Sequence, residues 1–213
     1  MPNNDKDLQF PPVSQASPDG LLALGGDLSA ERLMVAYRHG IFPWYDEGQS
    51  ILWWSPNPRM VLFLDEFKVS KSLRKEVRKE TFQVTFNKNF AGVIRQCASI
   101  KRDGQPGTWI LPEMEAAYLK LNALGHAKSV EVWQDGVLVG GLYGIDLPEY
   151  RIFCGESMFA KVSNASKVAL YEWVHYLQEH HYYFIDCQMY TDHLASLGAR
   201  EIPRKTFMKY LEE

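Results

Sequence analysis

The sequence has no long apolar run, no basic leader and few cysteines, and each absence excludes a class of protein. No stretch approaches the roughly 18 apolar residues of a membrane-spanning helix, and residues 1–5 do not begin a signal peptide. We therefore expect a soluble, cytoplasmic protein. The three cysteines, Cys97, Cys154 and Cys187, are odd in number and lack C-x-x-C spacing, which argues against a disulfide framework and a structural zinc site.

The six histidines show no spacing typical of metal ligands, so we expect no metal site. What the chain does have is length and apolar content. With 213 residues, of which 46% are hydrophobic, it can bury a sizeable core in one domain, or in one domain with a small second one.

Charge is unevenly distributed along the chain. The net charge is −3, yet the segment 68–102 holds ten basic residues against two acidic ones, which makes it +8 and leaves −11 for the remainder. A basic region on an acidic body is typical of a protein that holds a polyanion at one place and a cationic partner at another. A solvated helix face explains the same charges, and charge alone leaves both interpretations open.

The first half of the chain predicts three helices and a strand. Ser29 caps a helix that Gly40 ends, and a second helix begins near Ser70 with a thin apolar stripe. A strand over 82–86 and a helix from Phe90 follow, with Asn caps available. These later elements are expected to make a small α/β lobe.

The second half predicts a helix, several strands, and then helix, strand and helix. The pair Asp135-Gly136 is a strong hairpin signal, and a later strand is expected to end at Gly155. The apolar run 182–185 predicts a buried strand that ends at Asp186. A carboxylate in that place is typical of a catalytic site, although it also fits a turn cap.

This order of elements resembles the acetyltransferase-like (GNAT) fold, so we expect an α/β (α+β) protein. A fresh pattern begins after the break at Gly104-Gln105-Pro106-Gly107. We therefore expect residues 1–104 to form an N-terminal lobe with the basic helix, and residues 105–213 to form a GNAT-like catalytic domain.

Ten short motifs run in order along nearly the whole chain. They are GLLALGGDL (20–28), GIFPW (40–44), WWSPNPR (53–59), TWI (108–110), SVEVW (129–133), GGLYG (140–144), GESMF (155–159), NASK (164–167), IDCQ (185–188) and HLASLGA (193–199). In their number, order and spacing they resemble the leucyl/phenylalanyl-tRNA–protein transferases.

The resemblance implies an activity and its substrates. It implies an enzyme that moves leucine, phenylalanine or methionine from aminoacyl-tRNA to the N-terminal arginine or lysine of an acceptor protein, which marks that protein for degradation by the N-degron pathway. The ester to the tRNA ribose is already activated, so neither ATP nor another cofactor is implied. We expect a monomer.

The resemblance also assigns residues to the terminal adenosine of the tRNA. Trp44, Trp109 and Tyr118 match positions that stack on the base, and such stacking is worth about 1–3 kcal/mol per base. Glu156 matches a residue that hydrogen-bonds the terminal nucleotide or the ester region. The alternatives are a core role for each aromatic ring and a buried structural carboxylate for Glu156.

An uncharged pocket should select the amino acid, with discrimination of only a few kcal/mol among apolar side chains. By resemblance, its lining is Leu142, Phe153, Met158, Leu170, Trp173 and Ile185. Each of these side chains would also suit a hydrophobic core. Leu142 and Trp173 stand where relatives often carry methionine and phenylalanine, which leaves the shape of the pocket open.

Asp186 and Gln188 are implied to be the catalytic pair. Gln188 would contact the incoming amine through its amide oxygen and Asp186 would orient Gln188, as a proton relay or by positioning. Alternate residues of a strand face the same way, so we expect these two on one side and Cys187 on the other. Asp186 and Glu156 are expected to attract the cationic acceptor, and His193 is expected to be structural.

The basic segment would meet the phosphates of the acceptor stem. The residues expected there are Lys68, Lys71, Arg74, Lys75 and Arg78.

Two other functions stay open. An acetyltransferase that uses acetyl-CoA would need a Q/R-x-x-G-x-G/A loop to bind pyrophosphate, and no such string follows a predicted strand. A tRNA-binding module without activity would need the basic segment and the aromatic residues, but no Asp186/Gln188 pair beneath an apolar pocket.

Overall fold

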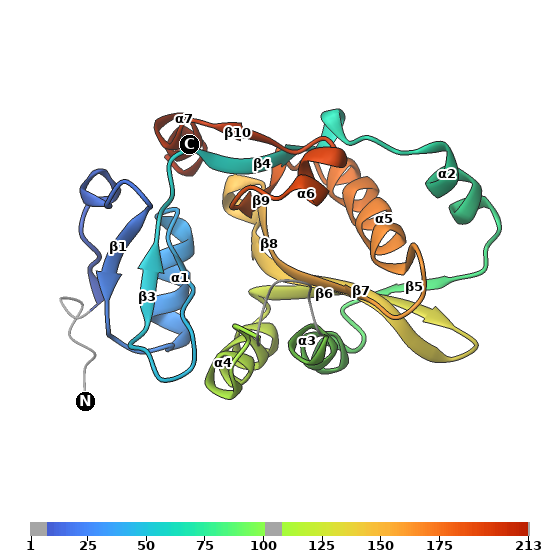
Figure 1. Cartoon of the computed structure of the whole chain (residues 1–213), viewed down its shortest axis with the longest axis horizontal. Helices are drawn as coiled ribbons and strands as arrows, with labels where there is room; N and C mark the ends of the chain where they lie inside the picture. Colours follow the sequence, from blue (N-terminus) through green and yellow to red (C-terminus); the bar gives the residue numbers. More distant parts are fainter. Residues whose placement is uncertain (1–7, 101–107, 213) are drawn as a thin grey trace.

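The computed structural model describes residues 8–100 and 108–212, and it is built around a central sheet (Figure 1). The order of its seven strands is β10-β4-β9-β8-β7-β6-β5. These strands are β4 (Arg59–Phe63), β5 (Gln83–Phe86), β6 (Ala127–Gln134), β7 (Val137–Leu147), β8 (Ile152–Ala160), β9 (Phe184–Gln188) and β10 (Arg200–Ile202).

A second, smaller sheet has the order β1-β3-β2 and contains residues from the start of the chain. Its strands are β1 (Leu21–Leu24), β2 (Phe42–Pro43) and β3 (Leu52–Trp54). The seven α-helices of the described residues are α1 (Ala30–Arg38), α2 (Lys71–Arg78), α3 (Phe90–Ser99), α4 (Pro112–Ala123), α5 (Ala165–Glu179), α6 (Asp192–Ser196) and α7 (Arg204–Met208).

Helices cover both faces of the large sheet, with α5 on one face and α3 and α4 on the other (Figure 1). Two adjacent glycines of β7 allow the helices to come close. A Cβ atom on Gly140 would lie 2.5 Å from Cβ of Ala165 in α5, and one on Gly141 would lie 3.2 Å from Val93 in α3. Successive strand residues point to opposite faces, so Gly140 leaves room for α5 on one face and Gly141 leaves room for α3 on the other. The expected mixed α/β class is confirmed.

The strand pairing in the large sheet is mixed. Strands β5 to β8 pair antiparallel with their neighbours, whereas β8 and β9 are parallel. Helix α5 supplies the connection that a parallel pair requires. The β8–β9 ladder stops at the pair Cys154 and Asp186, and from Gly155 onward β8 pairs only with β7. The two strands therefore part within their length.

Local signals place most element ends as expected. The side chains of Ser29, Ser70 and Asn89 each accept a hydrogen bond from a backbone N–H at the start of a helix. The strand expected to end at Gly155 instead continues to Ala160, because β7 offers it a partner along that whole length. The GESMF motif therefore lies on a strand.

The central sheet contains strands from both halves of the chain. Strand β4 pairs with β9, and β5 pairs with β6 at the sheet edge. The elements from α2 to α3 consequently belong to the large sheet and its cover, and they do not form a lobe of their own. The boundary expected at residues 104 and 105 lies outside the described residues.

The two faces of the large sheet bury separate apolar clusters. One cluster includes residues of α1, α3 and α4, and the other includes residues of α5 together with Leu73 of α2. Within residues 8–100 and 108–212, no helix combines the length and the apolar character needed to cross a bilayer.

Candidate active site

A cavity of about 450 Å³ opens where β8 and β9 part. Its lining comes mainly from β7, β8, β9 and α5, with the segment around β2 on another side. All six residues expected in the apolar pocket line it, namely Leu142, Phe153, Met158, Leu170, Trp173 and Ile185. The structure therefore brings this predicted set together in one place.

Two of the three aromatic residues expected to meet the adenosine also line the cavity. They are Trp44, which follows β2, and Trp109. The backbone of Trp44 is held on both sides, because its N–H donates to Leu52 O at 3.0 Å and its carbonyl accepts from Trp54 Nε1 at 2.6 Å. Its position is thus set by the small sheet.

Tyr118 does not have the place expected for it. The side chain is 0% exposed and its ring packs edge-on against Tyr143, so no face is free for a base. Its hydroxyl instead donates to Oε2 of Glu156 at 3.0 Å. Tyr118 lies inside the core because α4 packs against the sheet through that face of the helix. The expected stacking role of Tyr118 is wrong.

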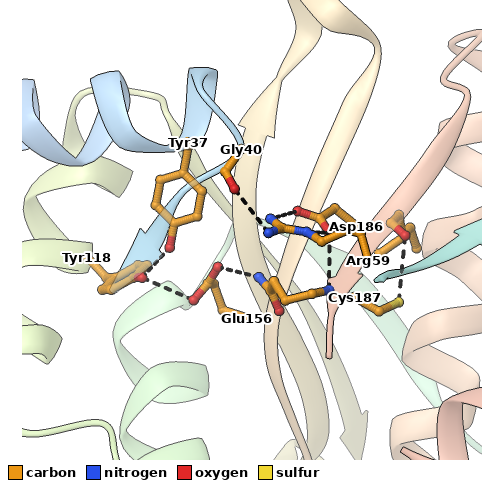
Figure 2. Close-up of polar contacts among 9 residues, drawn as sticks. Tyr37, Gly40, Arg59, Tyr118, Glu156, Asp186 and Cys187 are labelled. Carbon is orange, nitrogen blue, oxygen red and sulfur yellow. Dashed lines mark hydrogen bonds and ion pairs between the residues drawn. The ribbon is translucent and has the colours of Figure 1, made fainter. Parts of the chain in front are cut away.

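Glu156 of β8 is the centre of a hydrogen-bonded chain (Figure 2). Its Oε1 accepts from Nε2 of Gln188 at 3.0 Å, its Oε2 accepts from Tyr118, and the Tyr118 hydroxyl is bonded to that of Tyr37. Burial raises the pKa of Glu156 to about 7. Burial also raises the pKa of both tyrosines well above the ordinary value, so they remain hydrogen-bond donors.

Asp186 of β9 lies on the far side of this chain, in a buried ion pair (Figure 2). Nε and Nη2 of Arg59 donate to its two oxygens at 2.8 and 2.7 Å, and Nη1 of Arg59 donates to Gly40 O at 3.0 Å. The backbone N–H of Gln188 donates to Oδ1 of Asp186 at 3.1 Å. One guanidinium therefore connects the end of α1, the start of β4 and the Gln188 turn.

The expected facing of β9 is wrong. Gln188 and Cys187 both line the cavity, whereas Asp186 does not. A bulge explains the change, since Gln188 pairs with Met60 and Asp186 with Val61, which leaves Cys187 as the extra residue. Gln188 also has φ of 60°, in the left-handed region. Alternation holds only for regular extended backbone, and β9 leaves that conformation at its end.

These positions change the expected role of Asp186. It is 0% exposed and Arg59 is 1% exposed, so the carboxylate is neutralised in the core and cannot touch an incoming amine or attract a cation from solvent. Among the described residues that line the cavity, Glu156 carries the one carboxylate.

Arg59 was not among the expected site residues. The signal for it was an arginine directly before the apolar run 60–64, because a buried cation requires a buried partner. The carboxylate at the end of the other buried strand, Asp186, was the partner to look for.

The remaining expected residues lie at the surface. His193 of α6 is exposed and lines the cavity, and its pKa is lowered by partial burial and then by the charge of Lys167.

Helix α2 contacts α5, and its basic side chains point to solvent. The exposed set is Lys68, Lys71, Arg74, Lys75 and Arg78. Two further basic residues of the segment, Lys101 and Arg102, lie outside the described residues. In the described part of the chain, no three histidine, cysteine or acidic side chains come together as metal ligands would.

The chain is similar in sequence to proteins of one family. The profile described as leucyl/phenylalanyl-tRNA protein transferase matches residues 61–212, and the profile of its N-terminal domain matches residues 26–57. The two profiles divide the chain where the small sheet ends and β4 begins.

Three relatives bear the name leucyl/phenylalanyl-tRNA–protein transferase. The protein of Flavobacterium johnsoniae is 61% identical over 207 residues, which cover 97% of each chain. That of Flavobacterium psychrophilum is 56% identical, with 98% of each chain covered. That of Azotobacter vinelandii is 59% identical over 96% of this chain and 90% of its own.

Among solved structures, the L-PGS from Bacillus licheniformis aligns with a TM-score of 0.46 and 14% identity, over 75% of this chain and 51% of that chain.

Proposed function

The chain belongs to the leucyl/phenylalanyl-tRNA protein transferase family, and we propose that it transfers an amino acid from aminoacyl-tRNA to the N-terminus of a protein. The amino acid is leucine, phenylalanine or methionine, and the acceptor begins with arginine or lysine. The transfer marks the acceptor for degradation by the N-degron pathway. The observation that carries the proposal is one cavity with an apolar pocket, two aromatic side chains and the polar Glu156–Gln188 pair.

The apolar lining supports the choice of amino acid. Side chains such as leucine, phenylalanine and methionine can fill it, whereas an unpaired charge buried there would cost several kcal/mol. Discrimination among the three apolar side chains is limited to a few kcal/mol, because only shape distinguishes them.

The two tryptophans support adenosine binding. Trp44 and Trp109 line the same cavity as the apolar pocket, so a base stacked on either would bring the attached ester close to Glu156 and Gln188. Holding the ester and the amine together supplies most of the acceleration that such a transfer needs. The exposed basic side chains of α2 are the contacts we propose for tRNA phosphates.

Gln188 is the residue proposed to contact the acceptor amine. Its Nε2 is committed to Glu156, so its Oε1 is the amide atom that can accept a hydrogen bond from the amine. An N-terminal amine has a pKa of ~7.7–8.0, so a large fraction is neutral near pH 7.5. Asp186 acts as a positioning residue, since it holds the backbone N–H of Gln188 and does not line this cavity.

Purified protein mixed with leucyl-tRNA and an arginine-starting peptide tests this function. We expect labelled leucine to pass to the peptide, and to require both the ester and a free α-amine. The same peptide with an acetylated N-terminus is the control. Binding of tRNA without transfer would replace the proposal with a binding module, and transfer from acetyl-CoA would replace it with an acetyltransferase.

The reaction is proposed to occur in the cytoplasm, where aminoacyl-tRNA is found, with the protein as a monomer.

A further inference from the structure

Glu156 lies where proton transfer is needed in the proposed reaction. It is the one carboxylate among the described cavity-lining residues, just past the point where β8 and β9 part. Its Oε1 is 3.0 Å from Nε2 of Gln188, the residue proposed to contact the amine. The other acidic side chain of the region, Asp186, is fully engaged with Arg59 behind the cavity wall.

We propose that Glu156 is a catalytic residue that accepts the proton lost by the attacking amine and delivers it to the ribose oxygen that leaves. This inference rests on the transferase function proposed above. It goes beyond hydrogen bonding to the nucleotide, because it gives the carboxylate a part in the bond changes themselves.

The proposed step balances without another reactant. The amine nitrogen forms a C–N bond to the ester carbonyl carbon, and the C–O bond to the ribose breaks. The proton leaves the nitrogen for an oxygen of Glu156 and then passes to the ribose oxygen, so the carboxylate is regenerated. No electron is gained or lost, and no oxidant, reductant or further cofactor takes part.

The surroundings of Glu156 suit a group that must change protonation state. Burial raises its pKa to about 7, so both forms are populated near neutral pH. The charged and titratable groups that face it are Tyr37 from α1, Tyr118 from α4, Arg59 from β4 and Asp186 from β9. The two hydroxyls and Arg59 favour the carboxylate, and Asp186 opposes it.

Two features separate this role from simple nucleotide binding. A proton acceptor must be ionised for the step, whereas a hydrogen-bonding partner for adenosine need not be. The amine must also be neutral, and its pKa of ~7.7–8.0 lies close to that of Glu156. As the pH is lowered, the amine and Glu156 should each take up a proton, and the uptake of these two protons should lower the rate.

The test is the single-turnover rate at saturating leucyl-tRNA and peptide, measured between about pH 5.5 and pH 9. We expect Glu156→Gln to lower the rate at least about 10²-fold and to leave a profile with the uptake of one proton. Binding of leucyl-adenosine should stay within about tenfold of wild type, the size of one lost hydrogen bond. Glu179→Gln, on the exposed end of α5, is the matched control and should change neither quantity.

Tyr118→Phe keeps both the carboxylate and the buried ring, and it stays informative if Glu156→Gln fails to fold. It removes a hydroxyl that stabilises the carboxylate, so the Glu156 limb of the profile should move to higher pH.

The inference is overturned if Glu156→Gln keeps its rate within tenfold of wild type, if weaker leucyl-adenosine binding accounts for the whole loss, or if the limb does not move in Tyr118→Phe. Wild-type protein that transfers nothing would instead refute the proposed function.

Discussion

Replacing Arg59 by methionine should destabilise the protein far more than an ordinary surface substitution. Arg59 is 1% exposed and Asp186 is 0% exposed, and two hydrogen bonds of 2.8 and 2.7 Å join them. Removing one partner leaves the other charge buried without a counter-charge, which costs about 3–5 kcal/mol. We expect Arg59→Met to lose at least this much of the free energy of unfolding, since the bond to Gly40 is lost as well.

The double variant Arg59→Met/Asp186→Leu should recover part of the loss. It removes both charges and keeps apolar volume, and such replacements are often neutral or stabilising. The carbonyl of Gly40 still loses its donor and the backbone N–H of Gln188 loses its acceptor, and each unmade hydrogen bond of a buried group costs about 1–3 kcal/mol. The double variant should therefore be less stable than wild type by the cost of these two lost bonds, and more stable than Arg59→Met.

Urea unfolding near neutral pH measures both losses. The surface pair of Arg38 and Glu149, joined at 2.9 Å with both side chains 41% exposed, gives the matched control. Arg38→Met should cost no more than about 1 kcal/mol, because water replaces the lost contact. Equal losses in the single and double variants, or an Arg59→Met loss as small as that of Arg38→Met, would refute this reasoning about the buried charge.

The other expected outcomes concern pH, adenosine and salt. Glu156→Gln should stabilise the protein at high pH, because a carboxyl whose pKa rises from 4.5 to about 7 on folding binds more protons in the folded state within that window. The free energy of unfolding of the wild type should thus fall by about 3 kcal/mol as the pH rises from 4.5 to about 7. In urea unfolding, the difference in this free energy between Glu156→Gln and wild type should therefore grow with pH, and a difference that stays constant would contradict the prediction. Trp44→Ala should weaken leucyl-adenosine binding by about 1–3 kcal/mol in calorimetry, with Trp133→Ala, outside the cavity lining, as the control; equal effects would argue against stacking on Trp44. Lys75→Ala should reduce the slope of log tRNA affinity against log salt by about 1, whereas Lys120→Ala on α4 should leave it unchanged, and an unaltered slope for Lys75→Ala would exclude a phosphate contact there.

Much of the secondary structure could be predicted because its causes are local. Ser29, Ser70 and Asn89 start helices through bonds to backbone only three residues away. The pair Asp135-Gly136 turns the chain because both residues adopt positive φ, at 51° and 75°. Interactions of this range are visible in a short stretch of sequence.

The pairing partner of β5 could not be predicted from nearby residues in the same way. Its residues predict a strand, yet nothing near them says that its partner is β6, which lies beyond residue 126. Cross-strand contacts hold that pairing, because the Thr85 hydroxyl and the backbone N–H of Asn89 donate to the buried carboxylate of Glu131 on β6. The elements from α2 to α3 were therefore expected to form a lobe, and they instead extend the central sheet.

Motif order and hydrophobic periodicity are properties of the chain before it folds, and they were enough to predict the family, the α/β class and the side chains that could form an apolar pocket. Which carboxylate faces the cavity depends instead on how distant strands pack in the folded protein. Asp186 is withdrawn from it by Arg59, 127 positions earlier in the chain, and a bulge turns Gln188 inward toward Glu156. An ion pair over that separation depends on which strands become neighbours, whereas the strand period alone placed Asp186 on the same side as Gln188.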